Sequence, residues 1–574
     1  MSARAHRLIG WALALVTTLV VVANQRGVGI ARDEVVYMQN GARYADWWIG
    51  LVMLDHGVGV RSVTQTFGGP NPTDNNREHP PLMKTLFGLS EKLLHRTLGV
   101  TGEVTGFRLP SAILHGVLVL LVYLMVLELW GVAHAIVAAL LVLCLPRAVF
   151  HAGLACFDAP IMTLWFATIY AYWRGLDGRR WPWQVGVAWG LALATKHTAL
   201  LLPLALGVHY VIVALRARPR GGEGTAGATR RARAVANARA VIGYRWRVIV
   251  SLAVLGPVTL YAVWPWLWFD PMHHVRDWLT FHLHHVHYNY EYLGRNWNAP
   301  RFPWHVALVT TLFTVPAATL AAAVTGAGVW IAERIRRDPG RSERDLRGPV
   351  LLFALSLAAS AGPFFLGTTP IFGAEKHWMP VLPTLCIAAA AGVVWAARAA
   401  AGYLATFRAV GERLARRLAT GVLAGIAGSV VLAAAVETQL AEPYALTWYN
   451  ALAGGAPGGA DLGMNRQFWG VAVRGVLARL AAEARPTGNT YVYTHDASPA
   501  WGLYQRLGLV PSTLLDAGWE QAGIDRSELA VVIHERHFNR HDYLIWNSYR
   551  TVQPIYVLAS DGVPIVSVYR RPAR

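Results

Sequence analysis

Lysine, cysteine and acidic residues are all scarce in this sequence of 574 residues. Of its 52 basic residues only four are lysine, and 33 acidic residues leave a formal net charge of +19. The three cysteines exclude a disulfide framework, and they show no spacing typical of a metal site. Charged residues of either sign make up only 15% of the chain, which together with its apolar content excludes an intrinsically disordered protein.

Long apolar runs dominate the chain instead, and hydrophobic residues account for 54% of it. A helix needs about 20 mostly apolar residues to cross the hydrocarbon core of a bilayer. The first apolar run resembles a signal peptide, but no clear small-residue cleavage site follows it, and we interpret it as a retained span. The sequence predicts an α-helical polytopic membrane protein with about 11 transmembrane helices, at 8–25, 109–127, 131–146, 159–173, 181–195, 198–215, 248–269, 304–332, 348–369, 378–397 and 418–436.

The distribution of arginine predicts the direction of the spans, because cytoplasmic loops carry an excess of basic residues. With a cytoplasmic N-terminus, 25 basic and 7 acidic residues lie in the inner segments 1–7, 131–134, 174–181, 216–247, 333–348 and 398–417. This excess accounts for nearly the whole net charge, so the basic composition indicates membrane insertion and not nucleic-acid binding. We predict a multi-pass protein of the cytoplasmic (inner) membrane, with its N-terminus in the cytoplasm and its C-terminus outside.

The predicted topology divides the chain into three parts. A membrane domain spans 1–436 and includes two outer loops, 26–108 and 270–303. An outer connecting segment follows at 437–484. Residues 485–574 contain strand-like runs such as NTYVYTH and VPIVSVYRR, separated by helical stretches and turns. They predict a small C-terminal extracytoplasmic α/β domain.

Ionisable residues gather at the outer surface in this topology, and all four lysines lie on that side. A single such residue is most simply a snorkelling charge or a member of an ion pair. Carboxylates and cations at one depth suggest a site for a lipid-phosphate substrate, where a carboxylate removes a proton and cations bind a leaving anion. The candidates are Asp33, Glu34, His79, Lys84, Asp158, Lys196, His197, Lys376 and His377.

Five short motifs around these candidates resemble one family in content and in order. They are RDEVVY from residue 32, HPPLMK from 79, FDAP from 157, TKHTAL from 195 and AEKHWMPVLP from 374. The family is the membrane glycosyltransferases of the C-type fold (glycosyltransferase family 39-like), in the branch of the protein O-mannosyltransferases and lipid A aminoarabinose transferases. The resemblance covers roughly residues 8–470. The C-terminal domain resembles that of the family in position only.

The resemblance implies an enzyme that moves a hexose or pentose from a polyprenyl-phosphate carrier, of the undecaprenyl or dolichyl type, to a protein, lipid or glycan acceptor. The transfer would take place at the outer face of the membrane with inversion of configuration. By the same resemblance Asp33 would be the general base that deprotonates the acceptor hydroxyl. Glu34 would position the acceptor or the base, and Asp158 would orient another group of the site.

The cations are assigned to the donor by the same resemblance. Lys84, with His79 in its motif, would contact the donor phosphate, and Lys196 and Lys376 are further candidates beside His197 and His377. The family often has arginine at the position of Lys376, where lysine keeps the charge but loses the fork geometry. Such a cationic clamp implies that no cofactor is required.

Two alternatives remain open at this stage. Four histidines in one outer loop could bind a metal, although no carboxylate or cysteine stands at a set distance from them, and an aromatic membrane-surface belt is the favoured interpretation. They are His282, His284, His285 and His287.

A multi-pass transporter or a flippase for lipid-linked sugars would also place charges within a helical bundle. Transporters commonly show internal repeats, and we find none here.

Overall fold

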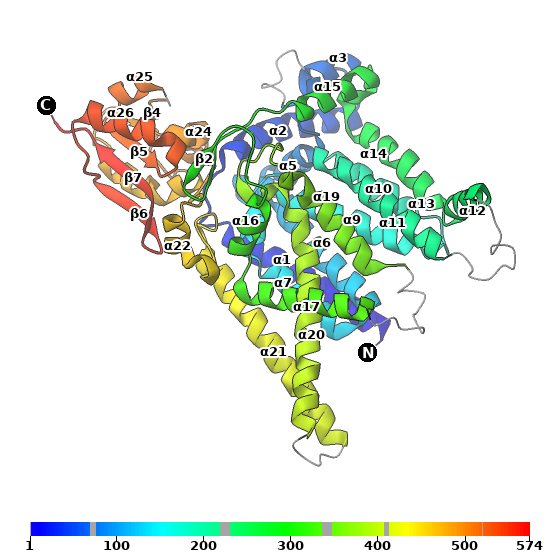
Figure 1. Ribbon diagram of the computed structural model, residues 1–574. Helices are drawn as coiled ribbons and strands as arrows, with labels where there is room; N and C mark the ends of the chain where they lie inside the picture. Colours follow the sequence, from blue (N-terminus) through cyan, green and yellow to red (C-terminus); the bar gives the residue numbers. More distant parts are fainter. Residues whose placement is uncertain are drawn as a thin grey trace.

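The computed structural model describes residues 2–68, 76–217, 230–335, 347–406, 412–518 and 520–573. It consists of a helical body and a small C-terminal domain built on a sheet (Figure 1). The helices of the body are α1 (Ala3–Asn24), α2 (Arg32–Val52), α3 (Val60–Val63), α5 (Leu82–Glu91), α6 (Glu103–Trp130), α7 (Val132–Leu143), α8 (Pro146–Ala152), α9 (Asp158–Gly175), α10 (Trp183–Leu193), α11 (Leu202–Arg216), α12 (Arg230–Gly243), α13 (Arg247–Val250), α14 (Gly256–Val263), α15 (Pro271–Leu283), α16 (Val306–Thr314), α17 (Ala317–Ile335), α19 (Pro349–Phe365), α20 (Leu382–Thr406) and α21 (Glu412–Ala441).

The predicted multi-pass membrane protein is confirmed, whereas the exact number of spans stays a prediction. Every predicted apolar segment lies on one or more helices. Five described helices are long and apolar enough to cross a membrane, and two bent pairs raise this number to at most seven. The single helix predicted for 304–332 is wrong, because α16 ends before Val315 and α17 begins after Pro316. A residue that precedes proline avoids the helical conformation, and Val315 is extended with ψ 139°.

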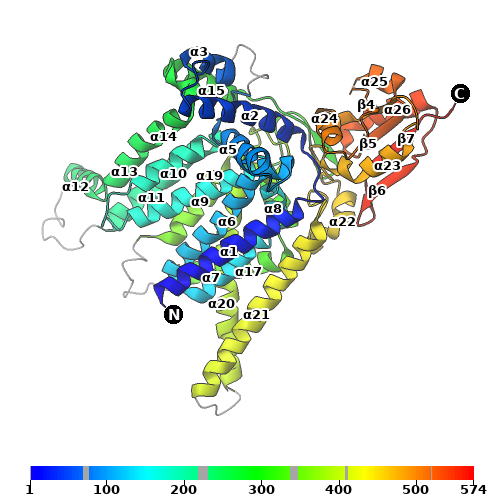
Figure 2. The same cartoon turned by 180° about the vertical axis from the view of Figure 1, so that it is seen from behind.

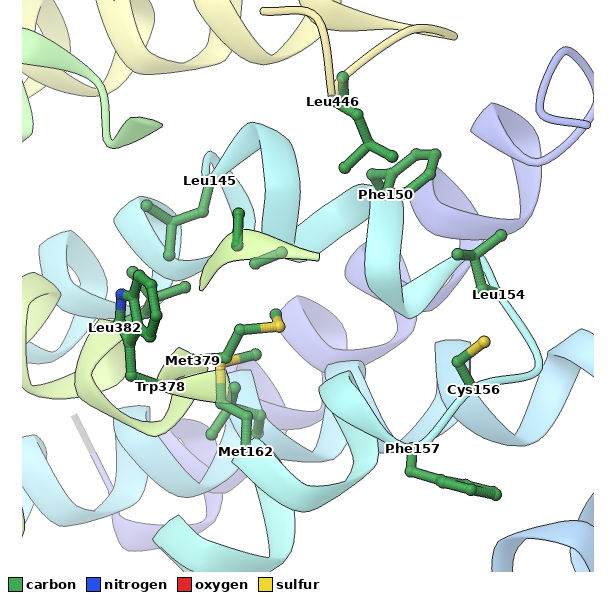
Figure 3. Packing of buried hydrophobic residues seen from close by; sticks show 14 of the residues in the cluster. Leu145, Phe150, Leu154, Cys156, Phe157, Met162, Trp378, Met379, Leu382 and Leu446 are labelled. Atoms are coloured by element: carbon green, nitrogen blue, oxygen red, sulfur yellow. The ribbon is translucent and has the colours of Figure 1, made fainter. Parts of the chain in front are cut away.

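A second residue before a proline also leaves the helical conformation, and the chain bends there so that α8 enters the interior of the body. Leu145, which precedes Pro146, is extended, and α7 and α8 meet at an angle of 67°. All seven residues of α8 are buried, although two of them, Arg147 and His151, are polar. Figure 3 shows buried apolar side chains of this region: Met162 of α9 lies close to Met379 and Trp378, and Phe150 of α8 lies next to Leu446. Helix α9 packs on α8 and also on the turn that precedes α20.

The N-terminus and the predicted outer regions lie at opposite ends of the body. In Figures 1 and 2 the start of α1, and the ends of α20 and α21 where the two helices meet, lie at one end. Helices α2, α3 and α15 and the C-terminal domain lie at the other end. The structure therefore places these predicted inner segments and the predicted outer segments at opposite ends of the body, as the arginine distribution does.

Helices α2 and α5 cross so closely that only glycine fits between them. A Cβ atom on Gly41 of α2 would lie 2.4 Å from the carbonyl oxygen of Lys84, and one on Gly88 of α5 would lie 2.0 Å from that of Gly41. Atoms at these distances would overlap. The two glycines therefore fix the position of α2, whose first turn carries Asp33, against the first outer loop.

The C-terminal domain is a five-stranded mixed sheet with helices, as its predicted α/β class requires. Its strand order is β4-β3-β5-β7-β6, and β3 runs parallel to both β4 and β5. The strands are β3 (Thr490–Tyr493), β4 (Leu514–Asp516), β5 (Leu529–Ile533), β6 (Tyr556–Ser560) and β7 (Val563–Arg570), and the helices include α24 (Ser498–Arg506), α25 (Gln521–Arg526) and α26 (Asn539–Tyr549). The carboxyl ends of β3, β4 and β5 share one edge of the sheet, because parallel strands end at the same side.

Candidate active site

Asp33 is a half-buried carboxylate in the first turn of α2, with 27% of its side chain exposed. The indole Nε1 of Trp469 donates a hydrogen bond to Asp33 Oδ2 at 2.9 Å. Arg32 Nε lies 3.6 Å from the other carboxylate oxygen. These two neighbours hold the Asp33 carboxylate at the positive end of the helix dipole, while part of it remains exposed.

Glu34, the next residue, has no exposed surface and no acceptor oxygen left for a substrate. Arg108 of α6 donates two charge-assisted hydrogen bonds to it, at 2.8 and 2.7 Å. The backbone N–H groups of Ala31 and Ala155 donate two more, at 2.9 and 2.7 Å. Glu34 therefore joins the start of α2 to α6 and to the chain before α9, and it holds Asp33 in place through this anchor.

Lys84 is equally enclosed. Its Nζ atom donates to the backbone oxygen of Asn76 at 2.7 Å, to Asn76 Oδ1 at 3.0 Å and to the backbone oxygen of His79 at 2.9 Å. An ammonium group has three protons, and these three acceptors use them all. The Lys84 side chain is completely buried, so it secures the turn 76–79 and does not face an open site.

A row of buried polar side chains links the remaining candidates. Lys196 Nζ lies 2.7 Å from Asp158 Oδ1, and His151 Nδ1 lies 3.9 Å from Asp158 Oδ2. On its other side, His151 Nε2 lies 3.7 Å from Glu375, which pairs with Arg147 at 2.7 Å. The 2.7 Å ion pair holds Asp158 in a fixed position beside Lys196, and the His151 ring lies between the carboxylates of Asp158 and Glu375.

Lys376 stands out because its ammonium group is buried beside aromatic rings. Its Nζ lies 4.1 Å from the ring centre of Trp469 and 4.9 Å from that of Phe372. Within the described ranges, this amine makes no hydrogen bond and no ion pair with a protein atom. Burial lowers the pKa of Lys376, and the nearby carboxylates of Asp33 and Asp158 raise it in opposition.

The fold of the turn before α20 presents Lys376 in this way. Gly373 has φ 71°, a conformation that side chains other than glycine rarely adopt. A Cβ atom there would lie 2.6 Å from Lys376 Cε, so only glycine lets the lysine side chain fold back across the turn. His377 closes the same turn, with Nε2 2.5 Å from the backbone oxygen of Phe372. His377 thus supports the turn that carries Lys376.

The histidines form aromatic contacts near this site. The rings of His197 and His282 stack at 3.7 Å, and the ring of His79 lies 6.2 Å from that of His282. His282 Nε2 lies 2.9 Å from the backbone oxygen of Glu78. In the part of the chain that the structure describes, no group of three His, Cys, Asp or Glu side chains has a geometry that could hold a metal ion.

The structure thus brings some of the predicted site residues together and encloses others. Trp469 touches both Asp33 and Lys376, and Lys196 Nζ lies 3.5 Å from the backbone oxygen of Lys376. With Asp158, these side chains combine a carboxylate open to a substrate with cations that can bind an anion. Glu34 and Lys84 are engaged in closed contacts instead.

Four residues of the site were missed by the sequence reasoning. Three of them carry a charge or an imidazole next to apolar segments, and that signal could have identified them. Trp469 carries no comparable signal, since the chain contains 24 tryptophans. The missed residues are Arg147, His151, Glu375 and Trp469.

One family model matches a stretch of the chain that carries several of the site residues. Residues 78–220 match the model of the dolichyl-phosphate-mannose-protein mannosyltransferase family. This match confirms the predicted resemblance over a stretch that contains Lys84, Asp158 and Lys196. No curated protein sequence matches the chain.

Several solved structures are similar to the chain at low sequence identity. ArnT from Cupriavidus metallidurans bound to undecaprenyl phosphate is 15% identical with a TM-score of 0.44, over 99% of this chain and 98% of that one. The apo state of the same protein has a TM-score of 0.46 at the same identity and coverage. The Archaeoglobus fulgidus oligosaccharyltransferase complex with zinc and sulfate is 10% identical with a TM-score of 0.40, over 94% of this chain and 70% of that one.

Proposed function

We propose that this membrane protein is an inverting glycosyltransferase that moves a sugar from a polyprenyl-phosphate carrier to an acceptor hydroxyl group. The observation that carries the proposal is the buried Lys376 ammonium, which has aromatic rings around it and no anionic partner bound to it within the described residues. A buried cation of this kind costs several kcal/mol unless a ligand neutralises it. The family match of residues 78–220 supports a lipid-phosphate-linked sugar as the donor.

The donor phosphate is bound by Lys376, with Lys196 beside it. As the bond between the anomeric carbon and the phosphate oxygen breaks, the carrier phosphate leaves with the bonding electron pair. Preorganised cations stabilise this growing negative charge more strongly than the charge of the intact donor, and they thereby lower the barrier. Because the two lysines supply this charge, we expect no metal cofactor to be required.

Asp33 acts as the general base. The acceptor oxygen attacks the anomeric carbon from the side opposite the phosphate and gives its proton to the open face of the Asp33 carboxylate. One displacement inverts the configuration at this carbon. Trp469 holds one carboxylate oxygen of Asp33 by its 2.9 Å hydrogen bond and covers Lys376 with its ring, so one side chain fixes the distance between base and phosphate site.

We assign supporting roles to the other predicted residues. Glu34 and Lys84 anchor the segments that carry the site, and Asp158 fixes Lys196 through their 2.7 Å ion pair. His79, His197 and His377 lie in the walls or turns of the site and do not carry charge to the donor. We further propose that the reaction occurs at the outer face of the inner membrane and that the C-terminal domain is extracytoplasmic.

The test uses purified protein in lipid nanodiscs and a panel of undecaprenyl-phosphate-linked hexoses and pentoses. A membrane extract serves as the source of acceptors. Every transfer releases one undecaprenyl phosphate whatever the acceptor is, and mass spectrometry measures this product. Asp33→Asn should lower the release by about 100-fold or more, the usual contribution of a general base.

Asp46→Asn provides the matched control. Asp46 lies on the same helix, its side chain is 67% exposed, and it pairs with Lys92 on the surface. This variant should keep the wild-type rate. Equal rates for wild type and Asp33→Asn would exclude Asp33 as the base.

A further inference from the structure

We propose that the C-terminal domain positions the catalytic base through an ion pair between Asp496 and Arg32. Asp496 is thus a positioning residue that acts on Asp33 through Arg32, and the small sheet domain becomes a part of the active site. This inference rests on the proposed function, in which Asp33 removes the proton of the acceptor.

Arg32 is one of the residues through which the C-terminal domain meets the helical body. Its Nη1 atom lies 2.8 Å from Asp496 Oδ1, and its Nε lies 3.6 Å from Asp33 Oδ1. Its backbone N–H donates to the backbone oxygen of Trp469 at 3.1 Å. Trp469 in turn holds Asp33 Oδ2. One arginine is therefore shared between the base and a carboxylate of the C-terminal domain.

The architecture of the C-terminal sheet explains why Asp496 can reach this position. Asp496 follows β3 and Glu535 follows β5, so both lie at the edge where the parallel strands end. This edge faces the start of α2. A further hydrogen bond joins the C-terminal domain to the chain before α2: the hydroxyl group of Tyr504 in α24 accepts it from the backbone N–H of Ile30 at 2.9 Å.

The electrostatic balance at Arg32 favours an influence on the base itself. Asp496 is only 9% exposed, and burial raises its pKa while Arg32 lowers it. Burial, Asp496 and Glu291 raise the pKa of Glu535 well above its usual range. Arg32 is thus the cation that faces this acidic edge, and its charge is divided between the edge and Asp33. The titratable groups that interact with Asp33 are Arg32, Tyr37, Cys156, Lys376 and Asp496.

Two variants should shift the pH dependence of kcat/KM in opposite directions. In Asp496→Asn, Arg32 loses its other partner and balances Asp33 alone, so the acidic limb of the profile should move to lower pH. In Arg32→Gln the Asp33 carboxylate loses its neighbouring cation, and the same limb should move to higher pH. The loss of the opposite charge at 3.6 Å in Arg32→Gln should shift the titration by about one pH unit. A purely structural contact would produce no such opposite shifts.

Arg506→Gln is the matched control for the interface. Arg506 of α24 also joins the C-terminal domain to the body, through a 3.4 Å ion pair with Glu103 at the start of α6. Neither residue contacts Asp33. The variant removes one ion pair of the same interface, and it should leave the pH profile unchanged.

Hydrogen exchange provides a readout that does not depend on activity. Deuterium uptake of residues 28–36 should increase in Asp496→Asn and Arg32→Gln, and it should stay at the wild-type level in Arg506→Gln. If both variants keep the wild-type profile and the wild-type uptake, the positioning role is wrong although the enzyme works. If the wild-type protein releases no undecaprenyl phosphate, the proposed function is wrong. The hydrogen-exchange test still applies in that case: wild-type deuterium uptake in Asp496→Asn and Arg32→Gln would contradict the anchoring contact.

Discussion

Replacing Lys376 by methionine should separate donor binding from folding. The change keeps the length and the apolar part of the side chain but removes the charge. The structure shows a buried ammonium with aromatic rings at 4.1 and 4.9 Å and no bound anion from the described part of the protein. A phosphate charge at about 4 Å from a cation gains up to about 4 kcal/mol at an effective dielectric constant of about 20.

The expected loss follows from this energy. Since Lys196 remains in the site, we expect a cost of about 2–4 kcal/mol, which corresponds to about 30- to 1,000-fold weaker binding. The assay is equilibrium binding of radiolabelled undecaprenyl phosphate to the purified protein in nanodiscs. Lys92→Met is the matched control, because Lys92 is another lysine of the predicted outer side and pairs with Asp46 at 2.6 Å.

Lys376→Met should not lower the stability of the folded protein, although it weakens the binding of undecaprenyl phosphate. A buried charge without a partner destabilises the folded state, so the Tm of Lys376→Met in the absence of lipid should equal or exceed that of the wild type. A structural lysine would show the reverse, with lower stability and intact binding. Wild-type affinity for undecaprenyl phosphate in Lys376→Met would refute the reasoning.

Three further predictions concern the charges around the site. Glu34→Gln should destabilise the protein by about 3–5 kcal/mol in thermal or chemical unfolding, because it leaves Arg108 buried without its counter-charge; a stable variant would show that Arg108 finds another partner. Lys84→Met should lower the Tm but leave the affinity for undecaprenyl phosphate near the wild-type value, because it leaves the buried acceptors of the turn 76–79 unpaired. A weaker affinity at an unchanged Tm would instead place Lys84 on the donor. Burial lowers the pKa of Lys376, so the affinity for undecaprenyl phosphate should fall as the pH rises through this pKa. Lys376→Arg stays charged, so its affinity should change little over the same pH range. Affinities of the two proteins that fall in parallel with pH would contradict this prediction.

The sequence was sufficient to predict the class of fold and to single out several charged residues that the structure brings close together. Asp33, Asp158, Lys196 and Lys376 were identified because charges next to apolar spans are costly and therefore informative. The strands of the C-terminal domain were predicted from their strand-like composition, except for β4, which has only three residues. The break between α16 and α17 was missed although Pro316 marks it.

The sequence could not distinguish open charges from enclosed ones. Glu34 resembles Asp33 in every local respect, yet its partner Arg108 lies 74 residues away. Lys84 resembles Lys376, but two of its partners are backbone oxygens, which no residue pattern reveals. The same limit concealed the contact between Arg32 and Asp496, which are 464 residues apart. Such pairs are set by tertiary packing and not by local sequence.

The most direct test of the central claim measures the fate of one donor in sealed proteoliposomes that contain the purified protein. The donor is an undecaprenyl-phosphate-linked sugar from the panel, and a membrane extract outside supplies acceptors. The account predicts that the wild-type protein releases undecaprenyl phosphate in proportion to the sugar gained by an acceptor, and that Asp33→Asn releases little. Movement of intact donor across the bilayer without release of undecaprenyl phosphate would contradict the account and indicate a flippase.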